Sequence, residues 1–273
     1  VYVIHPGTQD TVRLTDPTSH DLGAAWSPDG TQIAYHSNLL DEPSPLFNIW
    51  VMNADGSGKR QLTDHPADDR YPAWSPNGDE IAFQSLRDGN WELYSLDLES
   101  RSLTQLTDGP GTHWAPQYSP DGTVIAYEGG LPNDDRELHL LTLADLSTQP
   151  LTDRPWFDYS AQWKPDQAQI LFSHHLSASP GNLWFMDVPN YSNQIAQSTP
   201  GNDNAAAWSP DGKRVALMST RDGNNEIYIR NPLDVTDERL TNEPTRDDNP
   251  SWHEGIRHIG HAEPGSSATR TIT

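Results

Sequence analysis

The 273-residue sequence contains no cysteine, which excludes disulfide bonds and thiol catalysis. It has no apolar run of the roughly 18 residues that a membrane-spanning helix requires, so we expect no membrane insertion. Basic residues are also scarce, because 17 Lys and Arg stand against 39 Asp and Glu, for a formal net charge of −22. Nucleic-acid binding needs a cationic surface that neutralises phosphates, so the charge balance excludes a nucleic-acid partner.

Targeting and catalytic motifs are equally sparse. The sequence begins at Val1 without a signal peptide, and we expect the mature or trimmed form of an exported protein, periplasmic or extracellular. The Gly-x-Ser-x-Gly elbow of serine hydrolases does not occur. The segment from His253 to His258 is one residue longer than the zinc-protease motif His-Glu-x-x-His and falls on an expected hairpin rather than a helix.

What the sequence does contain is a repeat. An aromatic residue followed by Ser-Pro-Asp-Gly, or a close variant, returns at intervals of 48, 44, 45, 45 and 44 residues. The aromatic positions are Trp26, Trp74, Tyr118, Trp163, Trp208 and Trp252. A period in the forties with turn residues at a fixed offset is typical of propeller blades.

Each repeat is consistent with four short strands. The Pro-Asp-Gly turn joins the first strand to a second, because Pro presets the turn and Gly tolerates a positive φ. A third strand follows, and a fourth ends in Leu-Thr-Asp, as at residues 62–64 and 106–108. The sequence therefore predicts an all-β, six-bladed β-propeller with four-stranded antiparallel blades.

The two ends of the sequence indicate how the ring closes. Residues 1–16 align without a gap on residues 49–64, so the chain begins at a third strand. Residues 249–263 supply only a first and a second strand, which predicts a last blade built from both termini. Closure removes unpaired sheet edges. We expect residues 1–263 to form one domain and residues 264–273 to form a tail.

The repeat resembles the TolB-type β-propeller family. Two segments carry the resemblance most closely, Arg-Asp-Gly-Asn-Trp-Glu-Leu-Tyr at 87–94 and Arg-Asp-Gly-Asn-Asn-Glu-Ile-Tyr at 221–228. The resemblance implies the propeller fold over nearly the whole chain. It also implies several roles, because such propellers occur in periplasmic docking proteins, prolyl-oligopeptidase-like enzymes, sensor ectodomains and oligogalacturonate lyases. Fold alone does not choose among them.

One set of polar residues occupies a fixed place in the repeat, five residues before each aromatic: Asp21, Asp69, His113, Asp158, Asp203 and Asp247. In a propeller the first strand is innermost, so these residues are expected to ring one mouth of the channel. Five like charges repel unless a cation lies among them, and oxygen ligands favour Ca²⁺. Alternatively, each Asp caps a loop or bonds a neighbouring blade. We interpret the set as a candidate divalent-cation site.

The loops of irregular length are expected on the face of the propeller where this mouth of the channel opens. Such loops carry function in propellers. We expect a binding surface there, formed by His174, His175, Trp114, Trp156 and Phe157. Two functions follow. The favoured one is a monomeric, non-catalytic binding or scaffold module that engages a protein or peptide at the channel mouth. The alternative is a metal-assisted lyase or hydrolase acting on an acidic saccharide, with His113, His174 and His175 as metal ligands.

Overall fold

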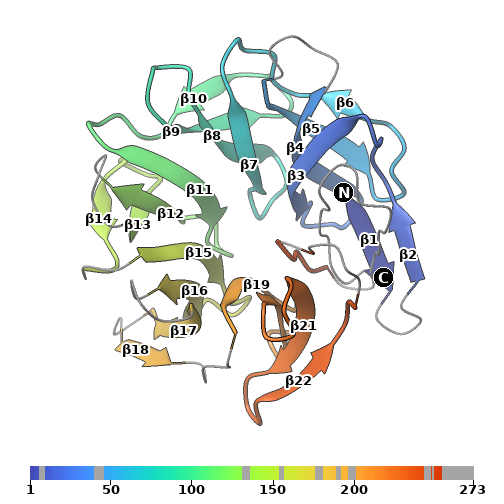
Figure 1. The fold of residues 1–273 in the computed structure, drawn as a ribbon. Helices are drawn as coiled ribbons and strands as arrows, with labels where there is room; N and C mark the ends of the chain where they lie inside the picture. Colours follow the sequence, from blue (N-terminus) through green and yellow to red (C-terminus); the bar gives the residue numbers. More distant parts are fainter. Residues whose placement is uncertain are drawn as a thin grey trace. The chain divides into compact units, whose positions relative to one another are not determined.

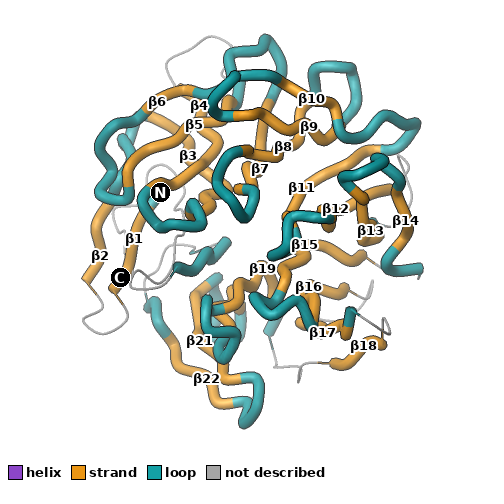
Figure 2. The backbone as a smooth tube through the Cα atoms, turned by 180° about the vertical axis from the view of Figure 1, so that it is seen from behind, coloured by secondary structure: helices purple, strands orange, loops and turns teal. Residues whose placement is uncertain are grey.

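The structure is a computed structural model that describes residues 1–5, 10–39, 46–130, 136–153, 157–175, 181–188, 192–195, 201–242, 247 and 249–253. Every regular element in these ranges is a β-strand, which confirms the all-β class (Figure 2). Within the described ranges no helix is long and apolar enough to cross a bilayer. The chain divides into two compact units, Thr18–Ala161 and Val1–Pro17 with Gln162–Thr273.

The Thr18–Ala161 unit contains three four-stranded antiparallel sheets, each with its strands in sequence order (Figure 1). The first consists of β3 (Ser19–Trp26), β4 (Gln32–Leu39), β5 (Asn48–Asn53) and β6 (Arg60–Gln61). The second consists of β7 (Asp69–Trp74), β8 (Glu80–Ser85), β9 (Glu92–Asp97) and β10 (Leu103–Gln105). The third consists of β11 (Thr112–Tyr118), β12 (Val124–Gly130), β13 (Glu137–Thr142) and β14 (Thr148–Pro150).

Two further sheets of the same kind follow in sequence. One consists of β15 (Phe157–Trp163), β16 (Gln169–His175), β17 (Asn182–Asp187) and β18 (Ser192–Ile195). The other consists of β19 (Asp203–Trp208), β20 (Val215–Ser219), β21 (Glu226–Asn231) and β22 (Thr236–Arg239). The N-terminal strands β1 (Tyr2–His5) and β2 (Asp10–Arg13) pair as a two-stranded sheet.

The Ser-Pro-Asp-Gly motif forms the predicted turn between the first and second strands. At the first copy, the Gly30 amide donates to the Ser27 carbonyl at 2.9 Å, and Gly30 has a φ of 68°. The Asp29 carboxylate accepts hydrogen bonds from the Ser27 hydroxyl (2.6 Å) and the Thr31 amide (3.0 Å). These bonds lower the pKa of Asp29, because they stabilise its ionised form. The repeated Asp is therefore a turn residue.

The Leu-Thr-Asp motif joins the fourth strand to the third. The Thr107 hydroxyl accepts a hydrogen bond from the Leu93 amide at 2.9 Å and donates to the buried carboxylate of Glu92. The Thr241 hydroxyl does the same with the Ile227 amide (2.8 Å) and Glu226. A threonine at this place thus satisfies a strand amide and a buried acid together.

The N-terminal segment has the contacts of a third and fourth strand. The Leu14 amide donates to the Val1 carbonyl at 3.0 Å, as the Leu62 amide donates to the Ile49 carbonyl at 2.7 Å. This equivalence supports the alignment of residues 1–16 with residues 49–64. The other half of the predicted last blade is not seen as strands. No strand is assigned at residues 249–253, and residues 259–261 and the tail at 264–273 lie outside the described residues. The structure shows five four-stranded blades and the small N-terminal sheet.

Adjacent sheets within a unit pack through apolar side chains. In the Thr18–Ala161 unit, Ile49 and Val51 of β5 form one buried cluster with Ile81 and Phe83 of β8. In the other unit, Ile4 of β1 is buried with Ile227 and Ile229 of β21, and Trp252 packs against the same cluster. Burying each such side chain contributes about 1.5–3 kcal/mol to the free energy of folding. The hydrophobic core thus lies between adjacent sheets.

Candidate functional site

The positions predicted to form a ring share one backbone contact wherever it is described. Each lies at or near the start of its expected first strand, and its amide donates to the carbonyl of the residue immediately before the third strand of the preceding sheet. The bonds are Asp69 to Phe47 (2.8 Å), His113 to Trp91 (2.8 Å), Asp158 to Arg136 (2.9 Å), Asp203 to Gly181 (3.0 Å) and Asp247 to Asn225 (3.0 Å). Asp21, in β3, accepts a hydrogen bond from the Ser19 hydroxyl at 2.7 Å.

Two of the ring carboxylates are buried and paired with arginine. Arg87 Nη2 lies 3.2 Å from Asp69 Oδ1. Arg221 Nη2 lies 3.2 Å from Asp203 Oδ1, and Arg230 Nη2 lies 3.4 Å from Asp203 Oδ2. A buried carboxylate needs a counter-charge, and in these two sheets arginine supplies it. Arg87 and Arg221 open the two Arg-Asp-Gly-Asn segments.

His113 reverses this arrangement. Its Nδ1 lies 2.9 Å from Oε2 of Glu92, a carboxylate that is almost fully buried. Glu92 Oε1 also accepts a hydrogen bond from the Asn90 side-chain amide at 2.7 Å. At this position the basic group is therefore on the ring residue and the acidic partner is on the third strand of the preceding sheet.

These pairings bear on the predicted cation site. In the part of the chain that the structure describes, no three His, Cys, Asp or Glu side chains come together as ligands for a metal ion. The oxygens of Asp69 and Asp203 face guanidinium groups, whose charge replaces that of a cation. Arginine therefore takes the place of a cation at two of the ring residues, and the structure does not test the prediction of Ca²⁺ at this ring.

The first strands have a bulge that the repeat did not reveal. Their pairing register shifts at Tyr71 and Ala115, among others, and the residue two positions after each ring residue has a positive φ. These residues are Gly23 (56°), Tyr71 (51°), Ala115 (48°), Ser160 (57°), Ala205 (39°) and Asn249 (52°). Non-glycine residues rarely adopt this conformation, so the surrounding contacts must stabilise it.

A side chain on the second strand of the preceding sheet provides that contact in the Thr18–Ala161 unit. It accepts a hydrogen bond from the amide of the positive-φ residue. The bonds run from Tyr71 to His36 Nδ1 (3.2 Å), from Ala115 to Gln84 Oε1 (3.0 Å) and from Ser160 to Glu128 Oε1 (2.9 Å). These acceptors are buried, and each follows the ring position of its own repeat at one constant sequence offset.

Glu128 extends this contact into a polar and aromatic cluster. Its Oε2 accepts a hydrogen bond from Arg136 Nη1 at 3.2 Å, and the Arg136 guanidinium carbon lies 4.3 Å from the centre of the Trp114 ring. Burial raises the pKa of Glu128, while the Ser160 amide and Arg136 oppose that rise. The backbone of Phe157 lies next to that of Arg136, because the amide of the next residue, Asp158, donates a hydrogen bond to the Arg136 carbonyl.

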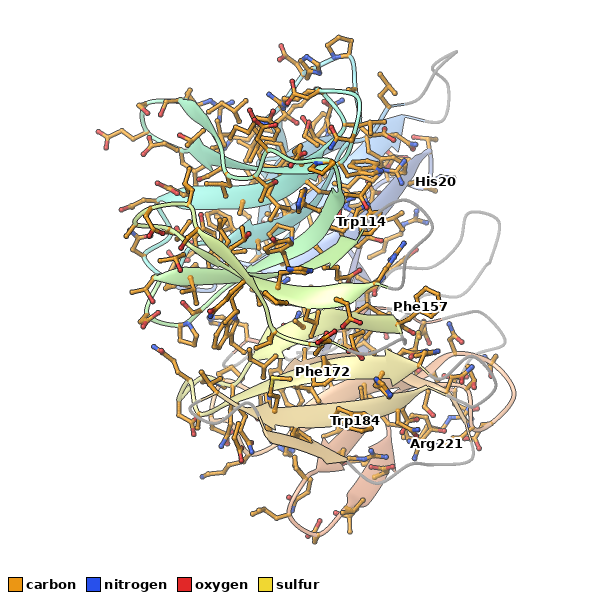
Figure 3. The ribbon with its side chains drawn as sticks, turned by 90° about the vertical axis from the view of Figure 1, so that its left-hand side faces the viewer. His20, Trp114, Phe157, Phe172, Trp184 and Arg221 are labelled. Carbon is orange, nitrogen blue, oxygen red and sulfur yellow. The ribbon has the colours of Figure 1, made fainter. Side chains whose placement is uncertain are left out.

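The side chains around Glu128 are partly accessible. Phe157 is 43% exposed, Tyr71 is 41% exposed and the Arg136 side chain is 46% exposed. Trp114 in β11 and Phe157 in β15 are labelled in Figure 3. Desolvation of the Tyr71 hydroxyl raises its pKa; the charge of Glu128 adds to this rise, and the charge of Arg136 opposes it. We call Tyr71, Trp114, Arg136 and Phe157 the Arg136 surface.

The remaining predicted surface residues have structural partners. His174 is buried, and its ring centre lies 4.5 Å from that of Trp184. His175 Nε2 lies 2.6 Å from Asn204 Oδ1. Trp156 lies outside the described residues. Of the predicted surface residues, Trp114 thus stacks on Arg136, and Phe157 lies next to Arg136 along the backbone.

Sequence reasoning missed Glu128 and Tyr71. A signal was present in the spacing. Glu128 follows His113 at the same offset at which Gln84 follows Asp69, and polar residues at a fixed repeat offset imply a shared contact. Arg87 and Arg221 likewise share one offset from their ring carboxylates.

The repeated antiparallel blades define an all-β propeller. The family model described as the TolB beta propeller domain matches residues 47–189, just over half of the sequence. The chain therefore belongs to the TolB beta propeller domain family, as the repeat indicated.

Solved structures agree on the fold. TolB from Acinetobacter baumannii is 20% identical with a TM-score of 0.69; the match covers 86% of this chain and 55% of that one. Oligogalacturonate lyase from Vibrio parahaemolyticus is 16% identical with a TM-score of 0.64, over 93% of this chain and 74% of that one. Hydrazine synthase from Kuenenia stuttgartiensis is 16% identical with a TM-score of 0.72, over 87% of this chain and 40% of that one. At these identities the likeness concerns the fold alone.

Proposed function

We propose that this propeller is a non-catalytic binding or scaffold module that docks a protein or peptide where its first strands begin. The observation that carries the proposal is the partial exposure of Tyr71 and Phe157 beside Arg136. Aromatic residues and arginine are the residue types that contribute most to protein–protein affinity. An exported location and a monomeric state belong to the same proposal.

The buried carboxylates of the first and second strands support binding rather than catalysis. A general acid or base must reach a substrate, yet Asp69 and Asp203 are buried in ion pairs with arginine. Glu128 is also almost fully buried and bonds Ser160 and Arg136. These carboxylates hold the framework of the blades, which a rigid docking module requires.

The metal-assisted lyase receives less support. It would need imidazoles available as ligands, and each candidate has a protein neighbour: His113 has Glu92, His174 has Trp184, and His175 has Asn204. The likeness to oligogalacturonate lyases is one of fold. A turnover screen on oligouronates with and without Mn²⁺ tests this alternative, and robust metal-dependent cleavage would replace the binding proposal.

Site-specific photo-cross-linking tests the proposed function directly. A benzophenone amino acid is placed at Phe157 or, as a control, at Leu103, which is 41% exposed on the fourth strand of its sheet. The variants are irradiated in the cells that make the protein. We expect a discrete cross-linked protein from position 157 and none from position 103. Equal labelling at both positions would contradict a docking site at Phe157.

A further inference from the structure

Arg136 is held in place on two sides. The face of its guanidinium rests on Trp114, and Nη1 bonds the buried Glu128 carboxylate. Within the described residues, Glu128 is the one hydrogen-bond acceptor of this guanidinium. The side chain is nevertheless 46% exposed, and the bond to Glu128 uses only part of the N–H donors that a guanidinium carries. Because stacking and the ion pair already restrict the side chain, a ligand that binds there loses little additional entropy.

The geometry of the Arg136 guanidinium favours a carboxylate as its ligand. The guanidinium donors form a planar fork that matches the two oxygens of a carboxylate. The chain carries a formal net charge of −22, which repels polyanions and doubly charged phosphate groups more strongly than a single carboxylate. A ligand with a single carboxylate is therefore the anion that this arginine can bind in spite of the negative charge of the protein.

The exposed aromatic rings favour a ligand that has an apolar group next to its carboxylate. Phe157 and Tyr71 are 43% and 41% exposed. The backbone of Phe157 lies next to Arg136, and the charge of Arg136 acts on Tyr71. Covering these rings removes apolar surface from water, which favours a ligand with an apolar side chain next to its acid. A free carboxylate such as acetate would make the ion pair but leave the rings uncovered.

We propose that the Arg136 surface binds a peptide segment that presents one Asp or Glu carboxylate, or a C-terminal carboxylate, beside an apolar side chain. Arg136 receives the carboxylate, and Phe157 and Tyr71 contact the apolar side chain. This assignment rests on the proposed docking function and adds the chemistry of the partner to it.

A displayed library of random dodecapeptides tests the two proposals separately. The library is selected on the wild-type protein, and enriched peptides are synthesised with each carboxylate, the C-terminal one included, unchanged or replaced by its amide. We expect one acid-to-amide change to weaken binding about tenfold, which corresponds to loss of a charge-assisted hydrogen bond. The Arg136→Gln variant should bind both forms equally. The Arg60→Gln variant, which removes the same charge from exposed strand β6, should keep the difference.

The outcomes are distinguishable. If no peptide is enriched, the docking function and this assignment both fail. If peptides are enriched but their acids are dispensable, or if the acid preference persists in Arg136→Gln, the assignment alone is overturned. The amide replacement needs no protein variant, so it remains decisive if Arg136→Gln does not fold. The Arg136→Lys variant keeps the charge without the planar fork and should retain only part of the preference.

Discussion

Arg87 Nη2 lies 3.2 Å from Oδ1 of Asp69, a carboxylate with no exposed surface at the start of β7. Arg221 and Asp203 repeat this pair with the same spacing in sequence. Each arginine also stacks on a tyrosine, with the guanidinium carbon 4.5 Å from the Tyr94 ring and 4.1 Å from the Tyr228 ring. The Arg-Asp-Gly-Asn segment thus neutralises the ring carboxylate of its own sheet.

The first prediction concerns this pair. Arg87→Met should lower the free energy of unfolding by about 3–5 kcal/mol, because it leaves the Asp69 charge buried without a partner. Adding Asp69→Asn should recover part of the loss, since the amide carries no charge. Urea unfolding of the single and double variants measures the coupling, and Arg60→Met on exposed β6 is the control. Additive effects of the two changes would rule out the ion pair as the reason for the repeated spacing within this chain.

The second prediction separates arginine from calcium at the ring. Since Arg87 and Arg221 already neutralise Asp69 and Asp203, we expect a chelator to leave the melting temperature unchanged. A bound ion would instead stabilise the native state by about 2.7 kcal/mol at a hundredfold excess over its dissociation constant. Elemental analysis with melting curves before and after chelation measures both. A Ca²⁺-dependent rise in melting temperature that Asp69→Asn abolishes would establish the cation site.

The repeat predicted the blades well because turn chemistry and the apolar pattern are local. The turn at Ser27 to Gly30 and the hydrogen bond from Leu14 to Val1 both join residues that are close together in the sequence. Asp69, His113, Asp158 and Asp203 also lie at the first or second residue of a first strand, because the repeat offset fixes their place.

The repeat offset did not predict which side chains pair with the ring residues. Whether Asp69 faces a cation or Arg87 depends on side chains brought together by the fold. The positive φ of Tyr71 and Ala115 was hidden for a related reason. A buried acceptor on the preceding sheet stabilises each bulge, and no turn residue marks it in the sequence.

The third prediction concerns the threonine of the Leu-Thr-Asp motif. Thr107→Val keeps the side-chain shape but removes the acceptor of the Leu93 amide and the donor to Glu92. Leaving buried polar groups unpaired should lower the free energy of unfolding by about 1–3 kcal/mol. Thr104→Val, at an exposed position of β10, is the matched control and should change stability little. Equal effects of the two substitutions in urea unfolding would show that the motif threonine is not a structural bridge.

The last prediction concerns pH and the rings that flank Tyr127. His113 and His139 both contact Tyr127, with ring centres 5.5 Å and 5.3 Å away. Burial lowers the pKa of His139 below its usual value of 6.5, and the charge of His113 lowers it further. Between the folded and unfolded pKa values the unfolded chain binds more protons, so this group contributes stability above pH 6.5 that is lost as the pH falls. His139→Gln removes the titration. The free energy of unfolding, measured from about pH 8 to 5, should therefore fall less steeply in the variant than in the parent. If the two slopes are equal, protonation of His139 is not linked to folding.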